Sequence, residues 1–600
     1  MSTLEDLPFD IASLHAAYAE GVSPDAVIEA CFARLAAAED PGIFLHLRDP
    51  GDLAAEAAAL PPFDPVSYPL WGLPFAVKDN IDVAGCPTTA ACPAFAYDAA
   101  ADATVIARLR AAGAIPLGKT NLDQFATGLV GVRTPHPAPR NAVDPALVPG
   151  GSSSGSAVAV ARGIVSFALG TDTAGSGRVP AALNDIVGLK PSLGAISASG
   201  VVPACRTLDT VSIFATTVED AWSAYRAMAA FDAGDPYSRA VPVPPLAAAP
   251  PALRVGVPDA ATREFFGDAA RARAFDAAIE RLAGLGAEIV ELDFTPFFEV
   301  AEMLYEGAWV AERMTVIEDL LRRDAEAVHP VTRRIVGAAD RLSAADAFRG
   351  IYRLEALKRQ AAPSLDKVDL LAVPTIPTVY SLSDLEADPV GPNSRLGTYT
   401  NFVNLMDLCG IAVPTGTQED GRPGSLTLLA PAGQDGLTAA VARQVERRAA
   451  DPAVAAGAAR GSGAELRPAP MPDEIALAVV GAHLSGMPLN HELTSRGARF
   501  LSVARTAPRY RLFALPGGPP ARPGLLRGET GGPVDLEIWA LPKHAFGDLM
   551  ASVPAPLCIG TVELDDGEQA QGFLVEASAT VDAQDITHFG GWRAYASAVA

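Results

Sequence analysis

The sequence predicts a large α/β domain followed by a small α+β domain. Helix-type stretches and short apolar strand-type runs alternate through to about residue 450, as in α/β proteins. A Gly/Ala/Pro-rich segment without clear apolar periodicity follows at 449–468 and is typical of an interdomain linker. Short strand-type runs separated by turn signals fill the remainder. We therefore predict a first domain over residues 1–448 and a second over residues 469–600.

The first domain should begin with helices over residues 1 to about 60, where Ser23 and Pro24 form an N-cap and first-turn pair. The apolar run from Pro74 to Val77 predicts a buried strand that ends at Lys78. A helix over 102–112, a strand over 114–118 and a helix opening at Ala157 should follow. In the second domain we expect strands at 474–480, 510–515, 534–541 and 572–575.

Composition excludes several classes of protein. Lys and Arg number 46 against 70 Asp and Glu, and the resulting net charge of −24 repels phosphate backbones, which predicts no nucleic-acid partner. The six cysteines show neither a CxxC pair nor a Cys/His zinc spacing, which favours reduced thiols and no metal. The acidic start lacks signal-peptide features, and no apolar run reaches the ~18 residues of a membrane span. We expect a cytoplasmic protein without a membrane segment.

The segment Pro149–Pro180 is the most informative part of the chain. Two Gly/Ser-rich turns flank one helix and one short apolar run, and such turns can direct successive backbone N–H groups at a developing oxyanion. A phosphate-binding loop is disfavoured because the Gly-Lys-Ser/Thr ending is missing. The turns are therefore either flexible loops or the setting of a serine nucleophile.

A serine nucleophile needs a base next to it. None of the four histidines in the first 450 residues lies in a Gly-rich context. A lysine can replace histidine if burial lowers its pKa enough to populate the neutral amine. Lys78, at the end of the predicted buried strand, is the candidate, and the alternative is an ordinary solvated lysine.

Three motifs together indicate a family. Lys78-Asp79-Asn80, Ser152 in a GGSS element and Ser176 in a GTDxxGS element stand 74 and 24 residues apart. With them, the chain strongly resembles the amidase signature family over roughly residues 60–440. The resemblance implies a central mixed sheet covered by helices and an amidohydrolase that acts on linear amides.

The resemblance also implies a role for each motif. Ser176 would attack the amide carbon, and Ser152, on a cis peptide, would relay the proton to Lys78. The N–H groups of Ser176 and of Thr173, Ala174 and Gly175 would form the oxyanion hole. Water would then hydrolyse the acyl-enzyme, and no metal or organic cofactor is implied.

Two further runs, Asn121–Gly131 and Tyr305–Arg313, resemble the allophanate hydrolase branch of the family. This implies allophanate as the substrate, bound by Gly128, Tyr305 and Arg313, since Arg suits a carboxylate. Tyr305 and Arg313 are eight residues apart, about 12 Å along a helix. They can reach one pocket only if Arg313 uses its length or the helix bends. Core packing for Tyr305 and a surface charge for Arg313 are the alternatives.

The stretch Val480–Asn490 resembles the C-terminal domain of the same branch, which is related in fold to gamma-glutamyl cyclotransferases. The resemblance implies decarboxylation of N-carboxycarbamate, with His483 as the residue at the implicated position and His491 as its competitor. A histidine could protonate the nitrogen as carbon dioxide leaves. It further implies urea or s-triazine nitrogen catabolism, a homodimer and a functional link to a urea carboxylase.

Two alternatives remain open from the sequence. The first domain could be an amidase of other specificity, such as a biuret-type or general amidase. The second domain could be a docking module without chemistry of its own.

Overall fold

The computed structural model describes residues 4, 6–448 and 468–599. All of the predicted linker except Pro468 lies outside the described residues. Contacts divide the chain into two compact units. The second unit holds the end of the chain together with residues 244–254 and 285–288, and the first unit holds most of the rest.

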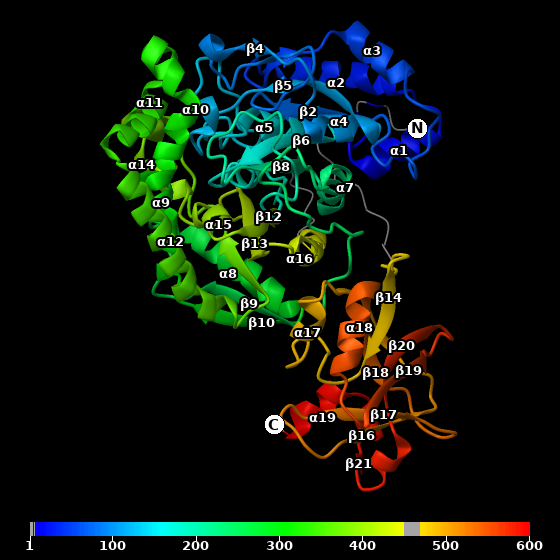
Figure 1. The fold of residues 1–600 in the computed structure, drawn as a ribbon. Helices are drawn as coiled ribbons and strands as arrows, with labels where there is room; N and C mark the ends of the chain where they lie inside the picture. The colour runs from blue at the N-terminus through cyan, green and yellow to red at the C-terminus, as the bar shows by residue number, and fades with distance from the viewer. Residues whose placement is uncertain (1–3, 5, 449–467, 600) are drawn as a thin grey trace. The chain divides into compact units, whose positions relative to one another are not determined.

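The first unit is built on one mixed sheet of 11 strands (Figure 1). In spatial order the strands are β1 (Phe44–Leu47), β5 (Ile115–Thr120), β2 (Pro74–Lys78), β6 (Phe167–Asp172), β8 (Thr210–Ala215), β7 (Val187–Lys190), β12 (Leu408–Thr417), β13 (Pro423–Pro431), β11 (Leu370–Pro374), β9 (Leu253–Pro258) and β10 (Ala287–Leu292). A two-stranded sheet adds β3 (Pro87–Thr88) and β4 (Tyr97–Asp98).

Helices cover this sheet, as predicted. The α-helices of this part of the chain are α1 (Ile11–Ala19), α2 (Pro24–Ala38), α3 (Pro50–Ala58), α4 (Thr104–Ala111), α5 (Ser154–Ala161), α6 (Val179–Leu183), α7 (Val218–Met228), α8 (Ala269–Gly284), α9 (Thr295–Glu306), α10 (Ala308–Asp324), α11 (Pro330–Gly337), α12 (Ala344–Leu365), α13 (Leu382–Ala387), α14 (Gly391–Leu396), α15 (Phe402–Leu405) and α16 (Asp435–Arg448). Helices α5, α7, α8 and α16 pack on the strands, while α9, α10 and α12 pack on one another in the green part of Figure 1.

Strand β2 lies between β5 and β6 and runs parallel to both. All five of its residues are buried, because layers of helices cover the sheet and a continuous apolar run is then favoured. Phe75 stacks on Phe167 of β6 with ring centres 5.1 Å apart, which fixes the register of the pair. The register places Val77 beside Leu169, so the carboxyl end of β2 meets the last residues of β6.

The predicted elements of the first unit are largely confirmed. Ser23 caps α2 by accepting a hydrogen bond from the N–H of Ala26, and Pro24 begins the helix. The first 60 residues are less uniformly helical than predicted, because β1 (Phe44–Leu47) interrupts the helices and pairs with β5. The helix predicted from residue 102 begins two residues later, at Thr104.

The second unit contains a five-stranded sheet in the order β15 (Arg499–Arg505), β18 (Asp535–Pro542), β14 (Glu474–Val479), β20 (Gln569–Val575) and β19 (Leu557–Glu563). A second sheet joins β17 (Pro523–Arg527), β16 (Tyr510–Ala514) and β21 (Gln584–Asp585). Three helices accompany the sheets: α17 (His491–Thr494), α18 (Lys543–Ser552) and α19 (Trp592–Val599). The strands predicted for this part of the chain are all present, and the α+β class is confirmed.

Several general expectations concern single residue types. All six cysteines are free thiols, and only Cys558 among them is exposed. Over residues 4, 6–448 and 468–599, no helix has both the length and the apolar character that crossing a bilayer requires. Nor do these residues bring three His, Cys, Asp or Glu side chains together as metal ligands.

Candidate active site

Lys78 lies at the carboxyl end of β2 and is fully buried. Its Nζ donates hydrogen bonds to Ser152 Oγ at 2.7 Å and to Thr171 Oγ1 at 2.8 Å. Burial lowers the pKa of Lys78 from 10.5 to about 7, because the charged ammonium is poorly solvated there. Three carboxylates act in the opposite direction without restoring the ordinary value: Asp123, Asp209 and Asp172. The neutral amine is therefore well populated near neutral pH.

Ser152 precedes α5 in a loop that is hydrogen-bonded to the run Asn121–Gly131. The Gly151–Ser152 peptide bond is cis, as the resemblance implies. The N–H of Asp123 donates to the carbonyl of Ser152, and the N–H of Gly151 donates to the carbonyl of Leu129. A Cβ on Gly151 would collide with the carboxylate of Asp123, so only glycine fits at this position. The two loops are thus locked together beside Lys78.

Ser176 lies in the turn between β6 and α6 and is buried. Its Oγ donates a long hydrogen bond, 3.5 Å, to the carbonyl of Gly128. The hydrogen bonds of the described residues thus join Lys78 to Ser152 and Ser176 to Gly128, and they include no bond between the two serines. The relay between Ser152 and Ser176 stays a prediction.

The turn that carries Ser176 is organised by a buried ion pair. Arg178 donates from Nε and Nη2 to the two carboxylate oxygens of Asp172 at 2.9 and 3.0 Å. Burial alone would raise the pKa of Asp172, but Arg178 holds it below its ordinary value. The same carboxylate accepts the N–H groups of Gly175 and Gly177, both at 3.0 Å.

This arrangement bears on the predicted oxyanion hole. The N–H of Gly175 already donates to Asp172, so it is the least available of the predicted donors. Within the described part of the chain, the N–H groups of Thr173, Ala174 and Ser176 have no protein acceptor. Gly175 has a φ of +130°, and a Cβ there would collide with Thr400. Glycine is therefore required for the turn itself.

Tyr305 and Arg313 meet because the helix is broken between them. Helix α9 ends at Glu306, Gly307 is extended with φ −128° and ψ −156°, and α10 begins at Ala308. The guanidinium carbon of Arg313 lies 5.2 Å from the ring centre of Tyr305. Two such residues on one helix can meet only if the arginine uses its length or the helix bends, and the break at Gly307 provides the bend.

Arg313 is buried and Tyr305 is half-buried, and both side chains are incompletely hydrogen-bonded. Arg313 is 2% exposed and donates only from Nη1, to Thr127 Oγ1 at 3.3 Å. Its Nε and Nη2 have no partner among the described residues, and neither has the hydroxyl of Tyr305. Burial raises the pKa of Tyr305, so its hydroxyl stays a donor. Buried donors without acceptors are costly, and they mark a place where a ligand can supply oxygens.

Sequence reasoning missed four groups around this site: the buried Thr171, Asp123 and Thr127, and the half-buried Asp209. Thr171 could have been found, because the parallel pairing of β2 with β6 puts it beside Lys78. Asp209 accepts from the hydroxyl of Thr173, and burial raises its pKa to about 6. It lies far from the Ser motifs in sequence, and no local pattern signals its position.

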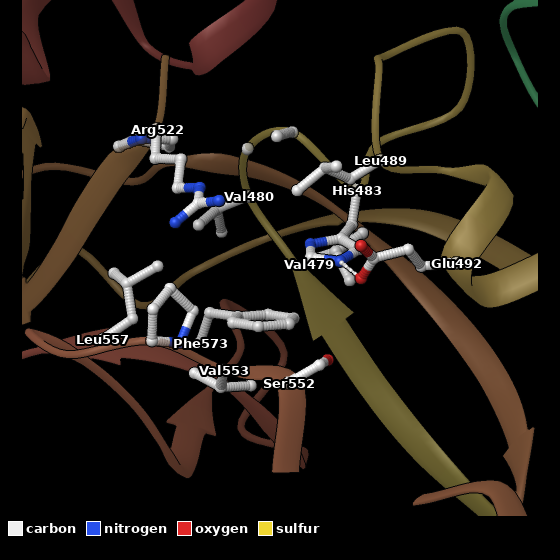
Figure 2. A pocket seen from close by; sticks show the side chains of 14 residues that line it. Val479, Val480, His483, Leu489, Glu492, Arg522, Ser552, Val553, Leu557 and Phe573 are labelled. Carbon is white, nitrogen blue, oxygen red and sulfur yellow. Dashed lines mark hydrogen bonds and ion pairs between the residues drawn. The ribbon is translucent and has the colours of Figure 1, made fainter. Parts of the chain in front are cut away.

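In the second unit, His483 lines a small pocket with a cavity volume of about 60 Å³ (Figure 2). Its ring stacks on Phe573 with centres 4.8 Å apart, and its Nε2 lies 3.1 Å from Glu492 Oε2. Burial lowers the pKa of His483, while Glu492 acts to raise it. His491 is not among the residues that line the pocket, and its Nδ1 bonds to the carbonyl of Pro488.

Comparison with known proteins agrees with both units. Residues 26–438 match the family described as Amidase, and residues 475–597 match the Allophanate hydrolase C-terminal domain. The urea amidolyases of Lachancea kluyveri and Saccharomyces cerevisiae are each 44% identical to this chain over 88% of its length. The chain spans only 30% of the length of each of these relatives.

A solved structure extends the likeness to the whole chain. The allophanate hydrolase of Kluyveromyces lactis superposes with a TM-score of 0.80 at 39% identity, covering 99% of this chain and 100% of that one. The chain therefore belongs to the amidase family of hydrolases and carries an allophanate hydrolase C-terminal domain.

Proposed function

We propose that the first unit hydrolyses allophanate to ammonia and N-carboxycarbamate with a Ser-cisSer-Lys triad. The observation that carries the proposal is the buried amine of Lys78, which has a pKa of about 7 and bonds to Ser152. A lysine with such a pKa can act as a general base near neutral pH. The likeness to the K. lactis allophanate hydrolase supports the choice of substrate.

In the proposed reaction, Ser176 Oγ attacks the terminal amide carbon of allophanate. Its proton passes to Ser152, and the proton of Ser152 passes to neutral Lys78. The N–H groups of Thr173, Ala174 and Ser176 stabilise the oxyanion, and that of Gly175 joins only if it releases Asp172. Lys78 then returns the proton through Ser152 to the leaving ammonia, and water hydrolyses the acyl-enzyme by the reverse route.

The carboxylate of allophanate would lie against Arg313 and Tyr305. The unpartnered Nε and Nη2 of Arg313 form a two-pronged donor set that suits a carboxylate. Gly128 would lie beside the reacting carbonyl, since its own carbonyl contacts Ser176. The buried setting strengthens each of these interactions over its value in water.

For the second unit we propose decarboxylation of N-carboxycarbamate with His483 as the general acid. The carbon–nitrogen bond to one carboxylate breaks, carbon dioxide leaves, and the nitrogen keeps the electron pair and takes a proton from His483. The product, carbamate, then decomposes to ammonia and carbon dioxide. The match to the Allophanate hydrolase C-terminal domain and the position of His483 in a largely apolar pocket support this step.

Urea catabolism is the proposed setting. A urea carboxylase would supply allophanate, and the match to longer chains named urea amidolyase supports such a link. A homodimer and a cytoplasmic location stay predictions.

Replacing the nucleophile or the base tests the proposal directly. Ser176→Ala and Lys78→Ala should each lower allophanate consumption at least ~10³-fold, because the proton transfer or the acyl-enzyme is lost. Ser383→Ala and Lys367→Ala, at exposed positions, serve as controls. A panel of allophanate, biuret, malonamate and simple amides fixes specificity. A higher kcat/KM for biuret or a simple amide than for allophanate would replace the proposed substrate by the alternative.

The pH dependence of allophanate consumption should follow Lys78. Its pKa is lowered to about 7, so the neutral base is lost as the pH falls. We expect kcat/KM to level off above about pH 8 and to fall about tenfold per pH unit below 7. A profile that stays flat from about pH 8 down to about pH 6 would remove Lys78 from the role of base.

Arg313→Gln should raise KM for allophanate about 10- to 100-fold, since a charge-assisted contact to the carboxylate is lost. For a neutral amide, kcat/KM should change less than about twofold. Arg322→Gln is the matched control, because Arg322 is an exposed arginine of the same helix that pairs with Glu318 and Asp319. Equal effects of Arg313→Gln on both substrates would rule out the carboxylate-binding role.

His483→Asn should separate the two steps. Allophanate consumption should be unchanged, whereas N-carboxycarbamate should accumulate and carbon dioxide should appear at the uncatalysed rate. Carbon-13 NMR of labelled allophanate follows both species, and the exposed His491 gives the control His491→Asn. If carbon dioxide release is unaffected and the assembly state changes instead, the second unit is a docking module.

A further inference from the structure

Besides His483 and Glu492, the pocket of the second unit contains a third titratable side chain, that of Arg522. Arg522, from the segment that leads into β17, reaches into the pocket from the side opposite His483 (Figure 2). The remaining walls are largely apolar. They include Val479, Val480, Leu489, Val553, Leu557 and Phe573.

Arg522 differs from the other arginines of its unit. Of the eight arginines among residues 468–599, six pair with a carboxylate: Arg499, Arg505, Arg509, Arg511, Arg527 and Arg593. Arg496 bonds to the carbonyl of Glu492. The side chain of Arg522 has no hydrogen bond or ion pair within these residues, and its Nε is buried without an acceptor.

An unpaired guanidinium in an apolar pocket is a binding site for a small anion. Taking the cation out of water is costly, and a bound carboxylate recovers that cost through two parallel hydrogen bonds. The cavity volume of about 60 Å³ accommodates about four to six water-sized groups, which suits a small carboxylate.

We propose that Arg522 binds the carboxylate that N-carboxycarbamate retains and so directs the breaking carbon–nitrogen bond toward His483. The inference rests on the proposed decarboxylation. The retained carboxylate lies on Arg522, and the departing carboxylate faces the apolar wall, where loss of hydration favours its conversion to neutral carbon dioxide. The electron pair of the broken bond stays on nitrogen, and the proton comes from His483, which regains one from water.

The charges of the pocket couple binding to proton transfer. His483 faces Glu492, which favours its protonated form, and Arg522 and His491, which disfavour it. A carboxylate on Arg522 neutralises the larger of these two repulsions. Substrate binding should therefore raise the pKa of His483, so that the acid is protonated when the substrate is in place.

Malonate tests the proposal, because it replaces the central NH of N-carboxycarbamate by CH₂ and is stable. The Cε1–H signals of the eight histidines are recorded in the full chain, and His483→Asn assigns the signal of His483. This readout is separate from any malonate bound in the first unit. Malonate should shift the His483 signal and raise its pKa. Arg522→Gln should weaken that binding about 10- to 100-fold.

Arg527→Gln is the matched control, because Arg527 lies at the end of β17, the strand that Arg522 precedes, and pairs with Glu563. It should bind malonate as the unchanged protein does. The inference fails if Arg522→Gln binds malonate with unchanged affinity, or if malonate never perturbs His483. Should Arg522→Gln lower the melting temperature, Arg522→Lys decides: weakened binding supports the two-pronged contact, and unchanged binding contradicts it.

Carbon dioxide release distinguishes this inference from the proposed function. If the unchanged protein does not accelerate decarboxylation while malonate binding depends on Arg522, the carboxylate site stands and the proposed chemistry falls. If decarboxylation is accelerated equally in Arg522→Gln, the chemistry stands and the role of Arg522 falls.

Discussion

The burial of the Lys78 amine is the constraint on which the first unit depends. Holding its pKa near 7 rather than 10.5 costs about 5 kcal/mol of folding free energy below pH 7, and this cost disappears as the pH approaches 10.5. A second buried lysine pairs with the carboxylate that follows Lys78 in the chain. Lys119 on the neighbouring strand β5 pairs with Asp79 at 3.1 Å, so the carboxylate next to Lys78 in the chain is already engaged. Lys78 is left with two hydroxyls instead of a charged partner.

Much of the fold and part of the site could be predicted from the sequence. Strand β2 was predictable because its apolar run ends in a lysine, and α2 because Ser23 and Pro24 mark its start. The bond between Lys78 and Ser152 was implied by family motifs rather than by any local pattern. Asp123 and Asp209 could not be assigned, since their roles depend on which loops the sheet brings together. The engagement of the Gly175 N–H by Asp172 is likewise a property of the folded turn.

Each unit places a titratable side chain where burial lowers its pKa. In the first unit burial lowers the pKa of Lys78, and in the second the carboxylate of Glu492 opposes the effect of burial on the pKa of His483. Both contain an arginine with unsatisfied donors: Arg313 beside Tyr305 in one, and Arg522 in the pocket of His483 in the other. In each unit a bound anion would supply the acceptors that these arginines lack, because the protein itself does not supply them.

The break at Gly307 places Tyr305 and Arg313 on two separate helices instead of one continuous helix. Lys78 and Ser176 lie on the sheet and its turns, whereas Tyr305 and Arg313 lie at a corner between two helices that pack chiefly on other helices. With the proposed roles, substitutions at this corner would change which amide is accepted without displacing the reactive groups, so that substrate range and reactivity could diverge independently.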